Sequence, residues 1–352
     1  MGTPTVLDRR ALNRALLARQ QLLGRAPRSS LEMVQWLVGL QAQEPVAPYI
    51  GLWARLVDFD PRELSELIAE RRAVRIGAMR GTIHLLSAPD CATLRPLTSP
   101  VLRRAFASTE FARQLGGADL DALVAAGTEL LATPRSAREL GDALAPRWPQ
   151  ADPLSLANAV RMLSPLVQVP PRGLWGRGGQ ARWITARAWL GRELDPAPSA
   201  ADMVLRYLGA FGPASVRDIQ AWSGLTGMRA VCDELADRLR VFADEAGNEL
   251  LDVLDGPLPD PDTPAPVRLL APFDNAILAH HDRARIIAPQ HRMALSRDRL
   301  MRTFLVDGFV AGTWRMERTG VAVTQFGALS GRELGAVERE AARLMAFLAT
   351  RS

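Results

Sequence analysis

Helix-type and β-type patterns follow one another in a recurring order along this chain, and that order restricts the fold more than any single motif does. Apolar residues at helical spacing run through residues 9–23, and an S-x-x-E capping box opens a second helix at Ser29. A further helical run over residues 62–73 leads into two β-prone stretches joined at Arg80 and Gly81. This segment is therefore predicted to form helices followed by a β-hairpin.

The order of helices followed by a hairpin returns twice further along the chain. Helical runs over 119–132, 136–148 and 152–166 precede a second hairpin over 167–186, whose tip is rich in glycine. A third pass, with weaker patterns, ends in a hairpin that turns at Gly247. This is the element order of a winged helix, so we predict three tandem winged-helix units. Their predicted boundaries are 1–90, 91–190 and 191–255.

The pattern changes after residues 256–266, a segment rich in proline and aspartate that we interpret as a linker. β-prone runs then dominate, with Asp307 and Gly308 as a hairpin signal, and residues 331–350 have an amphipathic helical pattern. We predict that residues 267–352 form a small antiparallel β-barrel followed by a terminal helix. The expected fold class is α+β, mainly α.

All 43 basic residues of the chain are arginine, because the sequence contains no lysine. The formal net charge is +5, which favours an anionic partner. GC-rich codon usage explains the arginine bias as simply as chemical selection does. In both cases no side-chain amine is present to form a Schiff base, and the α-amino group alone remains for that chemistry.

Cysteine usage and the apolar runs argue against several classes of protein. Cys91 and Cys232 stand far apart, without a C-x-x-C pair or a histidine-rich tract, so neither a disulfide framework nor a zinc site is indicated. The N-terminus lacks the apolar region of a signal peptide, and no apolar run approaches the roughly 18 residues of a membrane-spanning helix. We expect a soluble, cytoplasmic protein without a metal or a cofactor.

Two glutamines, Gln41 and Gln43, stand where an apolar helical run breaks before Pro45 and Pro48. A carboxamide has no basicity near neutral pH, but it offers one acceptor and two donors with which to hold a water molecule or a sugar hydroxyl. In an extended break, alternate side chains project to the same side. The alternative is that both amides satisfy backbone groups at a helix end. Glu44 is the one acid of this segment that could serve as a base.

Arginine and tryptophan side chains gather at the two predicted hairpins, a combination suited to phosphate contact together with stacking or groove insertion. The alternative is a solvated loop whose tryptophans fold inward. Two basic hairpins in register with helices support DNA binding better than either hairpin alone. The residues predicted to contact DNA are Arg75, Arg80, Arg172, Trp175, Arg177 and Arg182.

The histidines suggest a different kind of site. His280 and His281 lie in a polar stretch with Asp274, Asn275 and Asp282, which are enough groups for a small-molecule enzyme. No H-E-x-x-H, nucleophile elbow, phosphate-binding loop or dinucleotide fingerprint accompanies them. This interpretation predicts no salt-dependent affinity for DNA.

Five motifs, GLQAQ, AMRGTIHLL, GLWGRGG, LLAPFDNAILAHHDRARII and VDGFVAGTWR, occur in one order between about Leu12 and the C-terminal helix. Together they resemble the winged-helix DNA glycosylases of the AlkZ and YcaQ type. The resemblance implies tandem winged helices in a C shape, with a small β-barrel, around a DNA-binding channel. It also implies that the Q-x-Q motif of the AlkZ type, Gln41 and Gln43 here, is catalytic, whereas the YcaQ type carries Q-x-D.

The resemblance implies excision of N-alkylated purines such as N7-alkylguanines from double-stranded DNA, and unhooking of interstrand crosslinks by AlkZ-type members. We therefore expect a monofunctional DNA glycosylase that leaves an abasic site, with Gln41 and Gln43 positioning water and sugar. The absence of lysine fits hydrolysis better than a lyase that works through an imine. The principal alternative is a non-catalytic winged-helix DNA-binding protein, such as a regulator. We expect a monomer; whether the protein serves self-resistance or general repair stays open.

Overall fold

The computed structural model describes residues 4–318 and 320–351. The chain divides into two compact units. The first unit comprises the residues up to Asp60, residues 201–222 and residues from 226 to the C-terminus, and the second comprises residues 61–200 and 223–225. The predicted first module, 1–90, is thus divided at Asp60 between the two units. The predicted winged-helix boundaries stay predictions.

The first unit opens with capped helices, as predicted. Helix α1 (Arg9–Arg19) begins after Asp8, whose Oδ1 accepts from the Ala11 amide at 2.7 Å. Helix α2 (Ser30–Trp36) carries the predicted capping box of Ser29 and Glu32. It ends before the glutamines, because Val38 and Gly39 have φ of 54° and 91° and leave the helical conformation. The short strand β2 (Leu40–Gln41) and helix α3 (Ala47–Trp53) follow.

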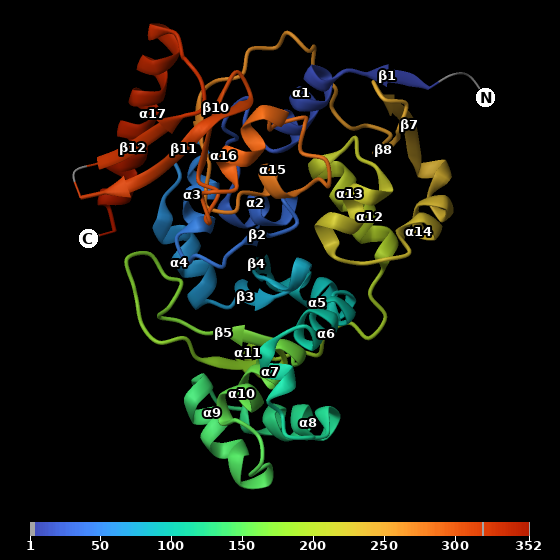
Figure 1. The fold of residues 1–352 in the computed structure, drawn as a ribbon, viewed down its shortest axis with the longest axis vertical. Coiled ribbons are helices and arrows are strands. Elements are labelled where there is room, and N and C mark those ends of the chain that lie inside the picture. The colour runs from blue at the N-terminus through green and yellow to red at the C-terminus, as the bar shows by residue number, and fades with distance from the viewer. Residues whose placement is uncertain (1–3, 319, 352) are drawn as a thin grey trace. The chain divides into compact units, whose positions relative to one another are not determined.

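A three-stranded sheet of order β1-β7-β8 confirms the third predicted hairpin (Figure 1). Strands β7 (Leu239–Asp244) and β8 (Glu249–Val253) are antiparallel, and Gly247 turns between them with φ of 79°. Strand β1 (Thr5–Leu7) runs parallel to β7, a pairing that the sequence did not predict. The helices before this hairpin are α12 (Ala200–Phe211), α13 (Val216–Ser223) and α14 (Met228–Glu234), followed by the 3₁₀ turn η3 (Ala236–Arg238).

The C-terminal part of the first unit is an antiparallel sheet of order β12-β11-β10-β9 packed against helix α17 (Gly331–Ala349) (Figure 1). Asp307 and Gly308, with φ of 44° and 81°, form the predicted hairpin turn. The described strands make an open sheet, so the predicted closed barrel is not confirmed. The other elements of this region are β9 (Arg268–Leu269), α15 (Asn275–Leu278), η4 (Pro289–His291), α16 (Arg292–Leu295), β10 (Thr303–Val306), β11 (Phe309–Glu317) and β12 (Gly320–Gln325).

Buried arginines connect distant segments of the first unit. Arg14, Arg19 and Arg55 have fully buried side chains, and each pairs with an aspartate that lies more than 200 residues later in the chain. Because a guanidinium presents two parallel N–H groups to a carboxylate, such pairs fix orientation as well as distance. The three pairs are Arg14–Asp307, Arg19–Asp252 and Arg55–Asp274.

The second unit contains the first two predicted hairpins in one antiparallel arrangement of order β4-β3-β5-β6. Strands β3 (Ala73–Gly77) and β4 (Ile83–Ser87) are joined through the 3₁₀ turn η1 (Met79–Gly81), after helix α4 (Pro61–Ala69). Strands β5 (Leu166–Gln168) and β6 (Trp183–Thr185) are joined by a long connection over residues 169–182. Both predicted hairpins are confirmed.

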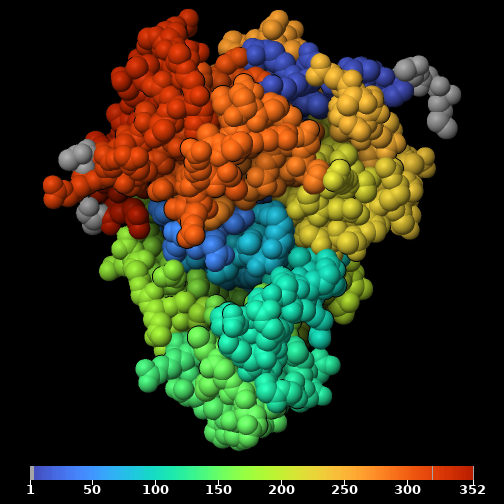
Figure 2. Space-filling view, viewed as in Figure 1, coloured from blue at the N-terminus to red at the C-terminus, as the bar shows by residue number. Residues whose placement is uncertain are grey.

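The second unit has a separate apolar core that includes Leu123, Leu140 and Leu156. Three helices enclose it: α8 (Leu120–Leu130), α9 (Ala137–Leu144) and α10 (Pro153–Leu163). Figure 2 shows this helical part, in teal and green at the lower end of the view, as a closely packed body. The helices of the unit that follow β4 are α5 (Ala88–Leu97), α6 (Ser99–Ala107), α7 (Glu110–Arg113), α8 (Leu120–Leu130), α9 (Ala137–Leu144) with the 3₁₀ turn η2 (Ala145–Arg147), α10 (Pro153–Leu163) and α11 (Ala186–Leu190). None of the helices within the described ranges is long and apolar enough to span a membrane.

Candidate functional site

The two predicted catalytic glutamines lie in the first unit between α2 and α3, Gln41 at the end of a short strand and Gln43 in the bend that follows it. Gln41 ends strand β2 and is 7% exposed, whereas Gln43 is exposed. Ala42 between them is fully buried. The extended break that the sequence predicted is therefore confirmed at its first residues. Helix α2 finishes at Trp36, and Gln41 and Gln43 lie beyond its last turn.

Helix α3 begins directly after this segment. The Ala47 amide donates to the Glu44 carbonyl at 3.0 Å, which turns the chain into the helix, and Pro48 occupies the first helical turn. A proline fits there because the first helical amides have no partner within the helix. The Glu44 side chain is partly exposed. Its carboxylate is thus accessible within three residues of both glutamines.

A buried ion pair anchors α3. Arg55 donates to both carboxylate oxygens of Asp274, at 2.7 and 2.9 Å, and to the Gly51 carbonyl of α3 at 3.0 Å. Arg55 also donates to Gln20 Oε1 at 3.0 Å, which ties the same guanidinium to the end of α1. Asp274 was predicted to belong to a site with the histidines, and no sequence feature indicated that Arg55 is its partner. Arg55 follows α3 without any local motif that could have revealed a partner 219 residues away.

The predicted arginines of the second hairpin lie in the connection 169–182 of the second unit, and their surroundings differ. Arg177 is exposed. Arg182 is held in an ion pair with Glu139 at 2.9 Å and also donates to the Pro134 carbonyl. Arg172 donates to the Gly179 carbonyl at 3.3 Å, within the loop itself. Arg177 is therefore the arginine of this group that is most accessible to a phosphate.

Trp175 and Arg75 lie on the inner side of this connection. The Trp175 amide donates to Ser65 Oγ of α4 at 2.9 Å, and the Trp175 side chain is partly buried. Arg75 is 2% exposed and lies against Gly173, where an added Cβ would come within 2.5 Å of Arg75 Nη1. Gly173 also has φ of 99°, so both the close approach and the backbone conformation require glycine. Of the six residues predicted to contact DNA, Arg75 has the least support, because its side chain is buried.

Arg80 of the first hairpin contacts a buried histidine. Its Nη2 lies 3.3 Å from His84 Nε2, and His84 Nδ1 lies 3.1 Å from the Thr82 carbonyl. Since a guanidinium only donates, Nε2 is the acceptor and Nδ1 carries the proton that is donated to Thr82. Burial, with a smaller contribution from the Arg80 cation, lowers the pKa of His84 to about 3. His84 is thus neutral at physiological pH and supports the hairpin turn.

The structure separates the residues of the predicted histidine site, because His280 is buried whereas His281 and Asp282 line an open cavity of about 400 Å³. His280 is 3% exposed and its Nε2 lies 3.0 Å from the Phe211 carbonyl, to which it donates. Burial, with a contribution from the Arg285 cation, lowers the pKa of His280, so the ring is neutral. His281 is exposed, and its backbone amide donates to Asp218. Within residues 4–318 and 320–351, no group of three or more histidine, cysteine or acidic side chains is arranged to hold a metal ion.

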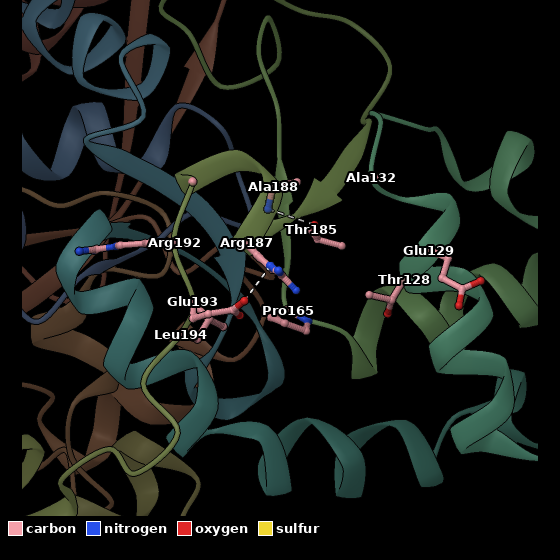
Figure 3. Close-up of a pocket in the computed structure, with 11 residues that line it drawn as sticks. Thr128, Glu129, Ala132, Pro165, Thr185, Arg187, Ala188, Arg192, Glu193 and Leu194 are labelled. Carbon is pink, nitrogen blue, oxygen red and sulfur yellow. Dashed lines mark hydrogen bonds and ion pairs between the residues drawn. The ribbon is translucent and has the colours of Figure 1, made fainter.

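The second unit contains an open cavity of about 820 Å³ beside α8, β6 and α11 (Figure 3). Its lining combines apolar residues with two threonines and four charged side chains, among them the exposed ion pair between Arg187 and Glu193, whose Nε and Oε1 are 2.7 Å apart. Gln41 and Gln43 belong to the other unit. The cavity thus gives no support to the predicted chemistry of the glutamines.

Comparison with known proteins supplies a further finding. A sequence model of the family described as DNA glycosylase AlkZ-like matches residues 34–347. An interstrand DNA cross-link repair glycosylase of Streptomyces sahachiroi is 25% identical to this chain over an alignment of 363 residues with gaps included. The alignment covers 93% of each protein. The solved structure of Streptomyces sahachiroi DNA glycosylase AlkZ has 22% sequence identity and a TM-score of 0.78, with 98% of each chain covered. The two chains therefore share a fold.

Proposed function

Because this chain belongs to the AlkZ-like DNA glycosylase family, as its motifs predicted, we propose that it is a monofunctional DNA glycosylase for N-alkylated purines. The proposed substrates are N7-alkylguanine monoadducts in double-stranded DNA, and interstrand crosslinks made through the same nitrogen. The relative from Streptomyces sahachiroi is an interstrand DNA cross-link repair glycosylase, which supports the second substrate. The observation that carries the proposal is the Q-x-Q segment itself, with the buried Gln41 at the end of β2 and the exposed Gln43 in the following bend, inside the region that matches the family.

Neutral amides suit this reaction because the leaving group is already activated. A purine alkylated at N7 is cationic, so its glycosidic bond breaks without a strong general acid. The remaining requirements are stabilisation of an oxocarbenium-like sugar and placement of a water molecule. We assign both to Gln41 and Gln43, whose carbonyl oxygens accept and whose amide groups donate. Glu44 is the proposed supporting carboxylate.

The product of this reaction is an abasic site. A lyase that cleaves the strand through an imine requires an amine nucleophile, and no lysine is present to supply it. Hydrolysis is the step that remains for the chain's own side chains: water adds at C1′, the base leaves with the bonding electron pair, and the water loses a proton.

Arginines of the second unit are the proposed grip on the DNA backbone. Arg177 is exposed on the connection between β5 and β6, and Arg80 lies at the tip of the β3–β4 hairpin. Each phosphate contact by an arginine displaces a counterion, so the affinity should fall steeply as the salt concentration rises. Arg172 and Trp175 are proposed as further contacts, and we expect the protein to act as a monomer.

The decisive experiment measures base release from a duplex that carries one N7-methylguanine. Abasic sites are converted to strand breaks with alkali, and the wild type is compared with Gln41→Ala, Gln43→Ala and Glu44→Ala. Gln290→Ala, which changes an exposed glutamine of η4, is the matched control. Loss of one positioning donor is expected to slow release by about 10² to 10³. DNA affinity should stay within about twofold, since an uncharged group contributes little to backbone binding.

The competing proposal is a non-catalytic DNA-binding protein, because winged-helix folds often bind without catalysis. It predicts salt-dependent DNA affinity without base release. A wild type that binds a monoadduct duplex and a crosslinked duplex, and releases base from neither, would establish that alternative.

A further inference from the structure

The side chain of Asn275 reaches the turn that precedes the Q-x-Q segment, although the two lie more than 230 residues apart in the sequence. Its Nδ2 donates to the Gly39 carbonyl at 2.7 Å and approaches the Leu37 carbonyl at 3.4 Å. Asn275 is the first residue of α15 and is 5% exposed. The contact is therefore a buried hydrogen bond from one short helix to the turn between α2 and β2.

This turn needs an external support because its backbone is unusual. Val38 has φ of 54°, a conformation that a β-branched residue rarely adopts, and Gly39 has φ of 91°. In a valine, a conformation of this kind persists only where surrounding contacts determine it. The carbonyls at the end of a helix also lack partners within the helix. Asn275 supplies a donor at this point of the turn.

The residue before Asn275 holds the other end of the same segment. Asp274 pairs with Arg55 through both carboxylate oxygens, and Arg55 donates to the Gly51 carbonyl of α3. Gly51 in turn lies close to Leu40, because a Cβ atom added to Gly51 would lie 3.6 Å from Leu40 Cδ2. The adjacent residues Asp274 and Asn275 thus support the chain on both sides of Gln41 and Gln43.

We propose that Asn275 is a positioning residue for the Q-x-Q segment, an assignment that rests on the glycosylase function proposed above. Gly39 is separated from Gln41 by one residue. A rotation of the Gly39 peptide plane would therefore turn Leu40 and Gln41 with it. The hydrogen bond from Asn275 fixes that plane and hence the direction in which the Gln41 amide points.

The chemistry of the side chain is specific to a donor. Both groups that face Asn275 Nδ2 are carbonyl oxygens, which accept and do not donate. An aspartate of the same shape would present a second acceptor to them and could form neither contact while ionised. Alanine would remove the donor and leave a small gap.

The test compares Asn275→Ala with a matched asparagine of the same unit. Asn13 is fully buried, and its Nδ2 also donates to two backbone carbonyls, those of Arg285 and Gly308 at 2.9 and 2.8 Å. Asn13→Ala removes these two hydrogen bonds and the one that Asn13 Oδ1 accepts from Arg14 Nη1, and none of the three touches the Q-x-Q turn. For both variants we would measure the single-turnover rate of base release, the dissociation constant for DNA, thermal unfolding, and hydrogen exchange of the amides of residues 38–44.

Asn275→Ala is expected to slow base release by about 10- to 100-fold, the loss that follows from a misplacement of about 1 Å. Its DNA affinity should match that of Asn13→Ala and its unfolding temperature should be no lower, while exchange at residues 38–44 should rise by about tenfold in Asn275→Ala alone. Equal release rates and equal exchange in the two variants would overturn the positioning role. If the wild type releases no base at all, the glycosylase proposal fails. The exchange measurement still decides whether Asn275 holds the turn.

Discussion

Asp252 is the partner of two arginines inside the first unit, and its replacement by asparagine is expected to cost about 3–5 kcal/mol of unfolding free energy. Arg19 and Asp252 have fully buried side chains, with Nη1–Oδ1 and Nη2–Oδ2 distances of 2.5 and 2.9 Å. Arg240 Nη2 lies 2.8 Å from the second oxygen. Asparagine keeps the shape of the side chain but removes the charge, so Arg19 becomes a buried cation without a counterion.

The magnitude rests mainly on Arg19. Arg240 is 29% exposed, and water therefore screens part of its loss, whereas Arg19 has no access to water. Breaking a buried pair by removing one partner costs about 3–5 kcal/mol, and we assign nearly all of this to Arg19. Arg19→Met combined with Asp252→Leu removes both charges at once. That double variant should recover most of the stability, because no unpaired buried charge remains between these two positions.

Urea unfolding followed by circular dichroism measures the difference, with Asp262→Asn as the control. Asp262 is 95% exposed and lies 3.7 Å from Arg10, so its loss should change the free energy of unfolding by less than about 1 kcal/mol. A loss below about 1 kcal/mol for Asp252→Asn as well would refute the argument. Base release by folded Asp252→Asn should equal that of the wild type, since Asp252 is not assigned to the catalytic segment.

Three further outcomes are expected. Gly39→Ala forces alanine to φ of 91°, which should lower the free energy of unfolding by about 1–3 kcal/mol and slow base release. Gly24→Ala is the control: an added Cβ at Gly24 meets only open space, so this variant should keep both the stability and the release rate of the wild type. The pKa of His84 is lowered from 6.5 to about 3, mainly by burial. Below pH of about 6.5, His84 therefore gains a proton in the unfolded chain while it stays neutral in the folded protein. The free energy of unfolding consequently falls as the pH drops from 6.5 towards 3. His84→Asn should remove on the order of 1–2 kcal/mol of the loss between pH of about 6.5 and 5, measured by urea unfolding at both values. Arg177→Gln should reduce the slope of log affinity against log salt by about one, and Arg182→Gln, already ion-paired, should reduce it less in the same titration.

The sequence predicted the elements whose signals are local. The capping boxes at Ser29 and Ser136 and the turns at Gly247 and Gly308 all occur as expected, because each depends on residues within four positions. The end of α2 was predicted four residues too late. Apolar periodicity continues through Leu40, and nothing local indicates that Val38 adopts a left-handed conformation.

The contacts that shape the candidate site are long-range, and pattern reasoning could not find them. Asn275 appeared in a polar stretch with two histidines, which suggested a site of their own. In the structure His280 donates to a backbone carbonyl, while Asn275 reaches the turn before β2. The β1–β7 pairing was missed for the same reason. Burial of Arg75 beneath Gly173 also depends on the path of the loop 169–182, which composition alone does not determine.

Catalysis by two neutral amides, as proposed, makes a particular demand on the surrounding structure. A strong general base can tolerate some movement, because its proton affinity is a property of the group. A carboxamide contributes through orientation alone, so an error in its direction removes most of its effect. The supports of the Q-x-Q segment are therefore expected to be rigid and buried. Asn275 and the Arg55–Asp274 pair meet that condition, since all three side chains are at most 5% exposed and each makes at least one hydrogen bond of 2.9 Å or less.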